Sequence, residues 1–361
     1  MQWRAANFAR DTAAKARRWP ANWRGLAALP LAAALLSFGG CATSKNQTAA
    51  EPAVLRVWPE PPAEARLAYV RSIRRPADLG VRTSGAGRLA KWLLGRDSRR
   101  DTLEQPFGLA LDEADNLCLT DTAAGTVSFC DLTRRTWQTW DRIGKIQLAL
   151  PVAVAKRGNL CFVADSALQK VLAFNLQGKL LFELAPSMQR PAGLAIIGDK
   201  LFVADAAAHQ ILIFDLAGNP AGAFGGRGTG PGQFNYPTHL CSDRKNRLYV
   251  TDSLNFRVQV FDAEGKHLNT IGAIGDTPGH LSRPKGVAVD GDGHIYVVDA
   301  AFENFQVFDA QGRLLLVVGR NGCGPGEFWL PAGIAITQDN KIYVADVYNQ
   351  RLQSFQYLPS P

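Results

Sequence analysis

Six aspartates recur along the chain and are its most numerous candidates for acid–base or metal chemistry. Each one ends an apolar run, and they are Asp121, Asp165, Asp205, Asp252, Asp299 and Asp346. An aspartate at the end of a strand commonly accepts hydrogen bonds from the N–H groups of the turn that follows. One aspartate at the same corner of each repeat therefore indicates a structural pattern, and we predict no catalytic carboxylate pair.

The histidines and cysteines do not form a recognisable metal or haem motif. Only five histidines are present, at positions 209, 239, 267, 280 and 294, and no two of them stand in a His-x-x-x-His pair. The chain also has no Cys-x-x-Cys-His sequence of the kind that attaches haem. We therefore predict no metal, no cofactor and no catalytic residue.

Two glycine-rich segments, GGRGTGPGQF at 225–234 and GRNGCGPGEF at 319–328, could be taken for phosphate-binding loops. A phosphate-binding P-loop needs Gly-Lys-Ser/Thr at the start of a helix. Here Pro231 and Pro325 interrupt what reads as a connection between two strands. We therefore interpret these segments as turns.

The elements that position these residues are read from a repeated unit, which is clearest at 246–262 (NRLYVTDSLNFRVQVFD). Two runs with alternating apolar residues flank a polar corner there, which predicts a β-hairpin. Each repeat opens with a proline, and successive prolines are 40 to 47 residues apart: Pro106, Pro151, Pro191, Pro237, Pro284 and Pro331. Four strand-like runs per repeat at this period predict an all-β, six-bladed β-propeller.

The sixth repeat ends after its third run, at 351–357. Its missing fourth strand has one good candidate near the other end of the chain, the segment Leu67–Ile73 (LAYVRSI). We predict that this N-terminal strand completes the last blade, so that no sheet edge stays open where the ring closes.

Residues 1–40 differ from the rest of the chain in composition. Six Lys or Arg residues precede a 13-residue apolar segment, Leu26–Phe38, which is shorter than the roughly 20 residues of a membrane span. The sequence Phe38-Gly39-Gly40-Cys41 that follows resembles a bacterial lipoprotein signal, in which the cysteine carries palmitate and other acyl chains. An ordinary signal peptide with an incidental cysteine is the alternative.

The lipoprotein resemblance implies a domain organisation and a location. It implies a signal peptide at 1–40 that is removed, a lipidated flexible tether at 41–63 and a propeller at 64–361. The protein would be held to a membrane of the cell envelope through lipid on Cys41. Because no aspartate follows Cys41, the resemblance implies the outer membrane, with the propeller facing the periplasm.

The net charge of +8 gives no support for a nucleic-acid partner. Without residues 1–40 the chain keeps 34 basic and 31 acidic residues, and the repeats at 102–361 hold 22 basic and 25 acidic residues. A nucleic-acid interface needs a concentrated basic surface, so we predict no nucleic-acid binding.

The segment PKGVAVDGDGHIYVVDAAFENFQVFDAQG at 284–312 resembles an NHL repeat, as do the two glycine-rich segments. The Asn-x-Arg of that family stands at Asn255/Arg257 and Asn349/Arg351. The resemblance covers about residues 102–357 and implies a six-bladed ring. The family includes a zinc-dependent peptidyl-hydroxyglycine lyase whose metal histidines follow the blade proline. None of the residues at that position here is a histidine: Phe107, Val152, Ala192, Thr238, Lys285 and Ala332.

Two groups of residues remain as candidates for binding. The residue two beyond each blade proline is expected to face the central channel, and His239 is the only polar one among Gly108, Ala153, Gly193, His239, Gly286 and Gly333. The residues directly after the prolines are expected to share a rim with the loops between the second and third strands. The candidate contacts on this rim and channel are Phe107, Thr238, His239, Leu254, Lys285, Phe302 and Tyr348.

A rim that carries aromatic and aliphatic groups and little charge suits a protein or peptide partner. We therefore expect a non-catalytic binding scaffold of the cell envelope. The alternative is a propeller-type hydrolase or lyase with a channel site near His239.

Overall fold

A computed structural model describes residues 56–81, 102–185 and 188–358, which lie in the compact unit Val54–Pro361. The predicted signal peptide, Cys41 and most of the predicted tether lie outside the described residues. Across the parts of the chain that the structure describes, no helix has the length and apolar character needed to cross a membrane.

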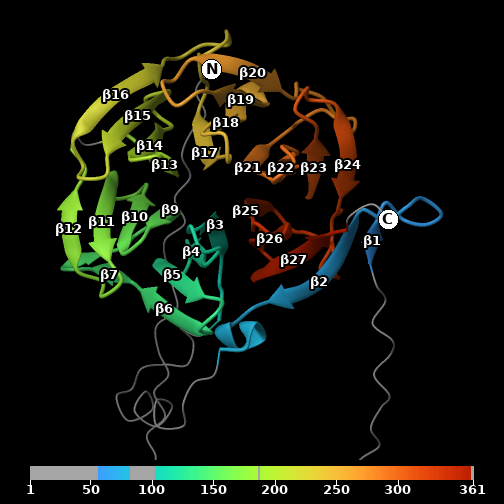
Figure 1. The fold of residues 1–361 in the computed structure, drawn as a ribbon, viewed down its shortest axis with the longest axis horizontal. Coiled ribbons are helices and arrows are strands. Elements are labelled where there is room, and N and C mark those ends of the chain that lie inside the picture. The colour runs from blue at the N-terminus through green and yellow to red at the C-terminus, as the bar shows by residue number, and fades with distance from the viewer. Residues whose placement is uncertain (1–55, 82–101, 186–187, 359–361) are drawn as a thin grey trace, which may run out of the picture. The chain divides into compact units, whose positions relative to one another are not determined.

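The structure is a six-bladed β-propeller in which each blade is one antiparallel sheet, as predicted (Figure 1). Blade one consists of β3 (Pro106–Leu111), β4 (Leu117–Asp121), β5 (Thr126–Asp131) and β6 (Thr136–Trp140). Blade two consists of β9 (Pro151–Arg157), β10 (Leu160–Asp165), β11 (Lys170–Asn175) and β12 (Leu180–Glu183). Blade three consists of β13 (Pro191–Ile197), β14 (Lys200–Asp205), β15 (Gln210–Asp215) and β16 (Pro220–Gly225).

The second half of the ring repeats this plan. Blade four consists of β17 (Pro237–Ser242), β18 (Leu248–Asp252), β19 (Arg257–Phe261) and β20 (His267–Ile271). Blade five consists of β21 (Pro284–Val289), β22 (Ile295–Asp299), β23 (Asn304–Phe308) and β24 (Leu314–Val318). Blade six consists of β25 (Pro331–Ile336), β26 (Lys341–Asp346), β27 (Arg351–Tyr357) and two strands from the N-terminal side, β2 (Leu67–Ile73) and β1 (Val57–Trp58).

The remaining elements are short connections. They are the hairpin β7 (Arg142–Ile143) and β8 (Ile146–Gln147) and the 3₁₀ turns η1 (Pro76–Leu79) and η3 (Ser253–Asn255).

The core is divided among the junctions between blades. The middle strands are buried on both faces, as in β4, β18 and β22, where every residue is buried. Their side chains form six apolar clusters, one at each junction between neighbouring blades. The outer strands are less buried, and in β20 and β24 only the last residue is fully buried. Each blade therefore gains its stability mainly from packing against its two neighbours.

The ring closes as predicted, through pairing of β2 with β27. The register runs antiparallel from Leu67 opposite Tyr357 to Ile73 opposite Leu352. Leu67 and Ile73 are fully buried. The edge of the last blade is therefore covered by a strand that lies more than 270 residues earlier in the chain.

The folded domain begins earlier than the predicted boundary at residue 64. Val57–Trp58 form β1, which pairs with β2. Trp58 is almost completely buried and packs edge-to-face on Phe355, with ring centroids 5.7 Å apart. The large apolar surface of the Trp58 ring is buried against the last blade. This packing places in the folded domain a segment that the composition of the sequence assigns to the tether.

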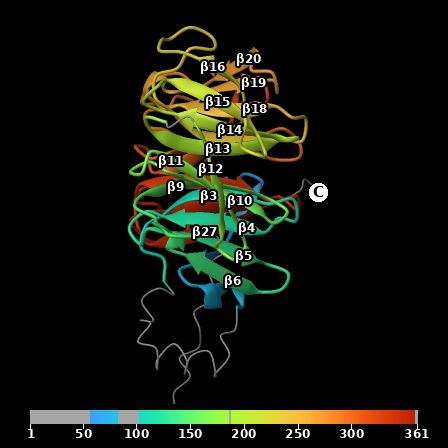
Figure 2. The ribbon, with the colours of Figure 1, turned by 90° about the vertical axis from the view of Figure 1, so that its left-hand side faces the viewer.

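The strands run between two faces of the ring (Figure 2). We call the face on which the six inner strands begin the proline face, because the blade prolines lie there. It carries the links between blades and the loops between second and third strands. The opposite face, called the far face, carries the other two loops of each blade.

Candidate functional site

The six repeated aspartates have a structural role, as predicted. Each is at most 2% exposed and accepts a hydrogen bond from the backbone N–H two residues before a blade proline. The six donors are the N–H groups of Glu104, Ala149, Gln189, Asn235, Ser282 and Trp329. The aspartates therefore fix the loops that lead into the inner strands.

The two Asn-x-Arg sequences tie the glycine-rich loops to these aspartates. Arg257 Nε donates to Asp252 Oδ2 at 2.8 Å, and its two terminal nitrogens donate to the carbonyl oxygens of residues 229, 230 and 233. Arg351 likewise donates to Asp346 and to the carbonyls of residues 324 and 327, but its Nη1 donates to the Ser72 hydroxyl of β2. These loops are thus held through their carbonyl groups, in agreement with their interpretation as turns.

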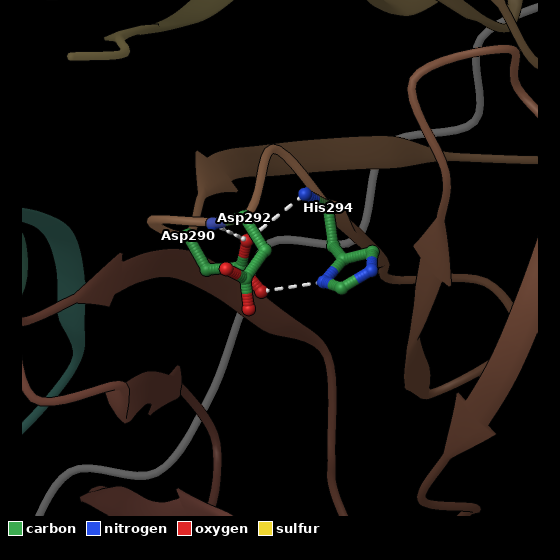
Figure 3. Close-up of side chains that lie close together, drawn as sticks. All are labelled: Asp290, Asp292 and His294. Atoms are coloured by element: carbon green, nitrogen blue, oxygen red, sulfur yellow. Dashed lines mark hydrogen bonds and ion pairs between the residues drawn. The ribbon is translucent and has the colours of Figure 1, made fainter. Parts of the chain in front are cut away.

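Asp290, Asp292 and His294 come close together on the far face (Figure 3). Asp290 accepts bonds from the backbone N–H groups of Asp292 and His294 and from His294 Nδ1 and Tyr296 Oη. Asp112 in blade one and Asp243 in blade four make the same turn bonds. The cluster is therefore blade five's version of a turn found in several blades.

The central channel opens on the far face as a cavity of about 690 Å³. The C-terminal ends of all six inner strands line it. Its wall includes a buried ion pair between Lys156 Nζ and Asp112 Oδ2, 2.7 Å apart. Burial alone would raise the pKa of Asp112, but the bonds from Lys156 and from backbone N–H groups hold this pKa below its usual value.

The other end of the channel is closed by two aromatic side chains from opposite blades. Each inner strand contacts the next around the ring, in the order β3, β9, β13, β17, β21, β25 and back to β3. Phe107 on β3 therefore lies opposite His239 on β17, and their ring centroids are 5.7 Å apart. The two predicted contact residues thus meet across the channel at the proline face.

The expectation that the second residue after each proline faces the channel is wrong for the four glycines at this position. A Cβ on Gly108 would lie 2.3 Å from the carbonyl oxygen of Val152, and one on Gly333 would lie 2.3 Å from that of Phe107. Gly193 and Gly286 face the next strand in the same way. These glycines allow neighbouring inner strands to approach closely, which makes the channel narrow at this end.

A chain of hydrogen bonds fixes the tautomer of His239. The Ser253 hydroxyl donates to the Pro284 carbonyl at 3.1 Å, so the Thr238 hydroxyl must donate its own proton to Ser253, 2.7 Å away. Thr238 then accepts from His239 Nδ1 at 3.2 Å. His239 Nε2 is left as a buried acceptor with no partner among the described residues. Burial, followed by the charge of Lys285, lowers the pKa of His239 to about 3.

Lys285 follows the proline of blade five and lies at this end of the channel. Burial lowers the pKa of Lys285, and the nearby guanidinium groups of Arg283 and Arg190 lower it further. Arg190 and Arg283 directly precede the prolines of blades three and five, on either side of blade four. The Arg190 guanidinium lies 5.8 Å from the ring centroid of Tyr236 in the loop that leads into blade four.

The other predicted contact residues lie on the proline face, with different degrees of exposure. Leu254 in η3 and Tyr348 after β26 are about half exposed, at 52% and 49%, whereas Phe302 and Thr238 are partly buried. Trp329 was not predicted from the sequence as a contact residue, although it is 50% exposed and lies against Tyr348 with ring centroids 5.4 Å apart. Its position in the sequence could have identified it, because it stands two residues before a blade proline, as Asn235 and Ser282 do.

Comparisons with known proteins agree on the fold. The DUF5128 family, described as a 6-bladed beta-propeller, matches residues 240–303 and 283–358. No curated protein sequence matches the chain.

The similar solved structures include a streptogramin B lyase, with 12% identity, a TM-score of 0.53 and coverage of 71% of this chain and 94% of that one. Virginiamycin B lyase from Staphylococcus aureus has 14% identity, a TM-score of 0.52 and coverage of 71% and 96%. A protein of unknown function from Bacteroides thetaiotaomicron has 14% identity, a TM-score of 0.54 and coverage of 71% and 70%. At these identities the similarity supports the propeller fold and no shared activity.

Proposed function

We propose that this protein is a non-catalytic binding scaffold that holds a peptide segment of a partner protein on its proline face. The observation that carries the proposal is the half-exposed pair Trp329 and Tyr348, whose rings are in contact. Aromatic residues that leave a large apolar area in water are typical of the anchoring contacts of protein interfaces.

Other exposed apolar groups lie on the same side of the ring. The described residues include eight large, exposed apolar side chains, and four of them are in loops of the proline face: Leu254, Ile274, Trp329 and Tyr348. All four belong to blades four to six or to the links between these blades. The loops of the far face at 243–247 (DRKNR) and 290–294 (DGDGH) are polar by contrast. This difference between the two faces favours a docking surface on the proline side.

The alternative, a hydrolase or lyase at His239, has weaker support. Nε2 of His239 is buried and the imidazole packs against Phe107. No carboxylate of the described residues makes a hydrogen bond or ion pair with this histidine, and its low pKa makes the imidazole a weak general base at neutral pH.

The location of the scaffold is proposed from the sequence. We propose an NHL-type propeller attached by lipid on Cys41 to the cell envelope, at the outer membrane and facing the periplasm. The lipid would supply the location, and the proline face would supply the contact with the partner.

A peptide selection tests the proposed function directly. A displayed library of random peptides is selected on the full chain, and the enriched peptides are measured against a Trp329→Ser/Tyr348→Ser variant. The matched control is Leu268→Ser/Leu315→Ser, which removes two half-exposed apolar side chains from the outer strands β20 and β24. We expect the aromatic variant to lose at least about tenfold in affinity, roughly 1.4 kcal/mol, and the control to bind normally. Enriched peptides that bind both variants equally well, or no enrichment, would contradict the proposal.

A further inference from the structure

Three cationic side chains of the described residues lie near the closed end of the channel, and none of them is held in an ion pair. Lys285, Arg190 and Arg283 come from the residues that flank the prolines of blades three and five. The charges of both arginines act on Lys285, and the charge of Lys285 acts on His239. Within the described residues, none of the three cations forms an ion pair.

The repeat aspartates of blades three, four and five are already engaged elsewhere. Asp205, Asp252 and Asp299 are at most 1% exposed and accept hydrogen bonds from backbone N–H groups. Asp252 also accepts from Arg257. A partly buried ammonium group without a counter-ion costs folding free energy, so its retention at a channel mouth suggests that a ligand supplies the missing negative charge.

His239 provides a second, independent observation at the same place. The hydrogen-bond chain through Thr238 and Ser253 leaves Nε2 as a buried acceptor that needs an N–H or O–H donor. A complementary ligand therefore carries an anionic oxygen for Lys285 and a donor close to that oxygen. The C-terminal residue of a polypeptide has both, since its carboxylate and its own amide N–H are attached to the same Cα.

The geometry of the channel favours the end of a chain over its middle. Phe107 and His239 close the channel, and the inner strands approach so closely that a carbonyl oxygen lies 2.3 Å from where a Cβ of Gly108 would be. A continuous polypeptide cannot pass through this opening. A chain that lies across the aromatic pair on blade six can instead bring its end to the channel mouth.

We propose that Lys285, with Arg190 and Arg283, binds the free C-terminal carboxylate of the peptide that the proline face holds. The amide N–H of the same residue would donate to His239 Nε2 once the Phe107 side chain has turned aside. This inference rests on the proposed function and names the chemical group that the partner presents. Cationic recognition of a carboxylate by charge-assisted hydrogen bonds is among the stronger polar interactions in proteins.

A synthetic octapeptide array, made once with free C-termini and once with C-terminal amides, tests the proposal on the full chain. We expect the free-acid copy to bind about tenfold more tightly than the amide copy. Lys285→Gln should reduce binding of the free-acid copy to the level of the amide copy and leave the amide copy unchanged. Equal binding of both copies, or an equal loss from both in Lys285→Gln, would overturn the carboxylate assignment.

The same array separates this inference from the proposed function. In one outcome, both peptide copies lose binding to Trp329→Ser/Tyr348→Ser and keep their affinity for Lys285→Gln. That result would support the proposed scaffold function and contradict the carboxylate site. Amidated peptides with an internal Glu that bind as tightly as the free acids would also overturn the assignment of a chain terminus. Displacement of the peptides by acetate at a concentration similar to that of the peptides would overturn it as well, because the site would then bind any small carboxylate.

The melting temperature distinguishes a lysine that binds ligand from a lysine that only stabilises the fold. Lys285→Gln removes a cation that has no counter-ion, so we expect its melting temperature to equal or exceed that of the wild type while its affinity for free-acid peptides falls. Arg283→Gln, which changes an exposed side chain, should lower the same affinity severalfold. A Lys285→Gln protein that melts earlier and loses both peptide copies would assign Lys285 a structural role and contradict the proposal.

Discussion

Phe107 and His239 lie on opposite blades of the ring, and their ring centroids are only 5.7 Å apart. This contact divides the central channel into two unlike ends. The far face opens into a cavity of about 690 Å³, whereas the proline face ends in a closed, positively charged mouth. A ligand that reaches His239 from the proline face must therefore first displace the Phe107 ring.

The low pKa of His239 predicts an acid-sensitive contribution to stability. Burial and the charge of Lys285 lower this pKa to about 3, while an unfolded histidine titrates near about 6.5. Between these values the unfolded chain binds more protons than the folded chain, so the free energy of unfolding falls as the pH decreases from about 6.5, by at most about 1.4 kcal/mol per pH unit.

Urea unfolding at pH 7 and pH 5 measures this effect. Between pH 7 and pH 5 we expect the free energy of unfolding of the wild type to fall by about 1–2 kcal/mol more than that of His239→Gln. His280→Gln, which changes a histidine in an exposed loop, serves as the control and should follow the wild type. Identical pH dependence of the wild type and His239→Gln would contradict the assigned environment of His239.

The buried pair of Lys156 and Asp112 predicts strong coupling between the two side chains. Their exposed fractions are 5% and 3%, so Lys156→Met leaves a carboxylate buried without its cation. We expect this change to cost about 3–5 kcal/mol in the free energy of unfolding. Asp112→Asn added to Lys156→Met should recover at least about 1 kcal/mol, because it removes the isolated charge.

The comparison pair is Lys170 and Glu183, which lie at the surface with Nζ 2.7 Å from Oε2. Lys170→Met should cost less than about 1 kcal/mol, because exposed ion pairs contribute little. Chemical unfolding of the wild type and these three variants measures both pairs. Equal losses from Lys156→Met and Lys170→Met would show that burial of the first pair has no energetic consequence.

The strand that closes the ring predicts different costs for two substitutions in β2. Leu67 is fully buried, whereas Val70 in the same strand is 44% exposed. Leu67→Ala should lower the free energy of unfolding by about 2–5 kcal/mol, and Val70→Ala should change it by less than about 1 kcal/mol. Urea unfolding of both variants tests the closure, and a Leu67→Ala protein as stable as Val70→Ala would refute it.

Lipid attachment at Cys41 is testable in cells that are given an alkyne fatty acid. We expect labelled protein in the membrane fraction for the wild type and for Cys323→Ser, which removes an exposed thiol. Cys41→Ser should carry no label and should leave the membrane fraction. Labelling of Cys41→Ser, or an unlabelled wild type, would refute the proposed anchor.

The amino-acid sequence by itself determined the blade plan of this protein. The prolines, the aspartates and the alternating runs act within one repeat, so their pattern gives the number of blades and the turn role of the aspartates without knowledge of the tertiary structure. The incomplete sixth repeat likewise pointed to Leu67–Ile73 as the closing strand.

Only the tertiary structure decided what the proline face contains. Phe107 meets His239, Arg190 and Arg283 flank blade four, and Trp329 contacts Tyr348. Ring closure brings these side chains from different parts of the chain together. Trp58 joins the last blade for the same reason, since it buries its ring against Phe355. A repeat pattern specifies the direction of each strand, but contacts across the ring depend on the radius and packing of all six blades together.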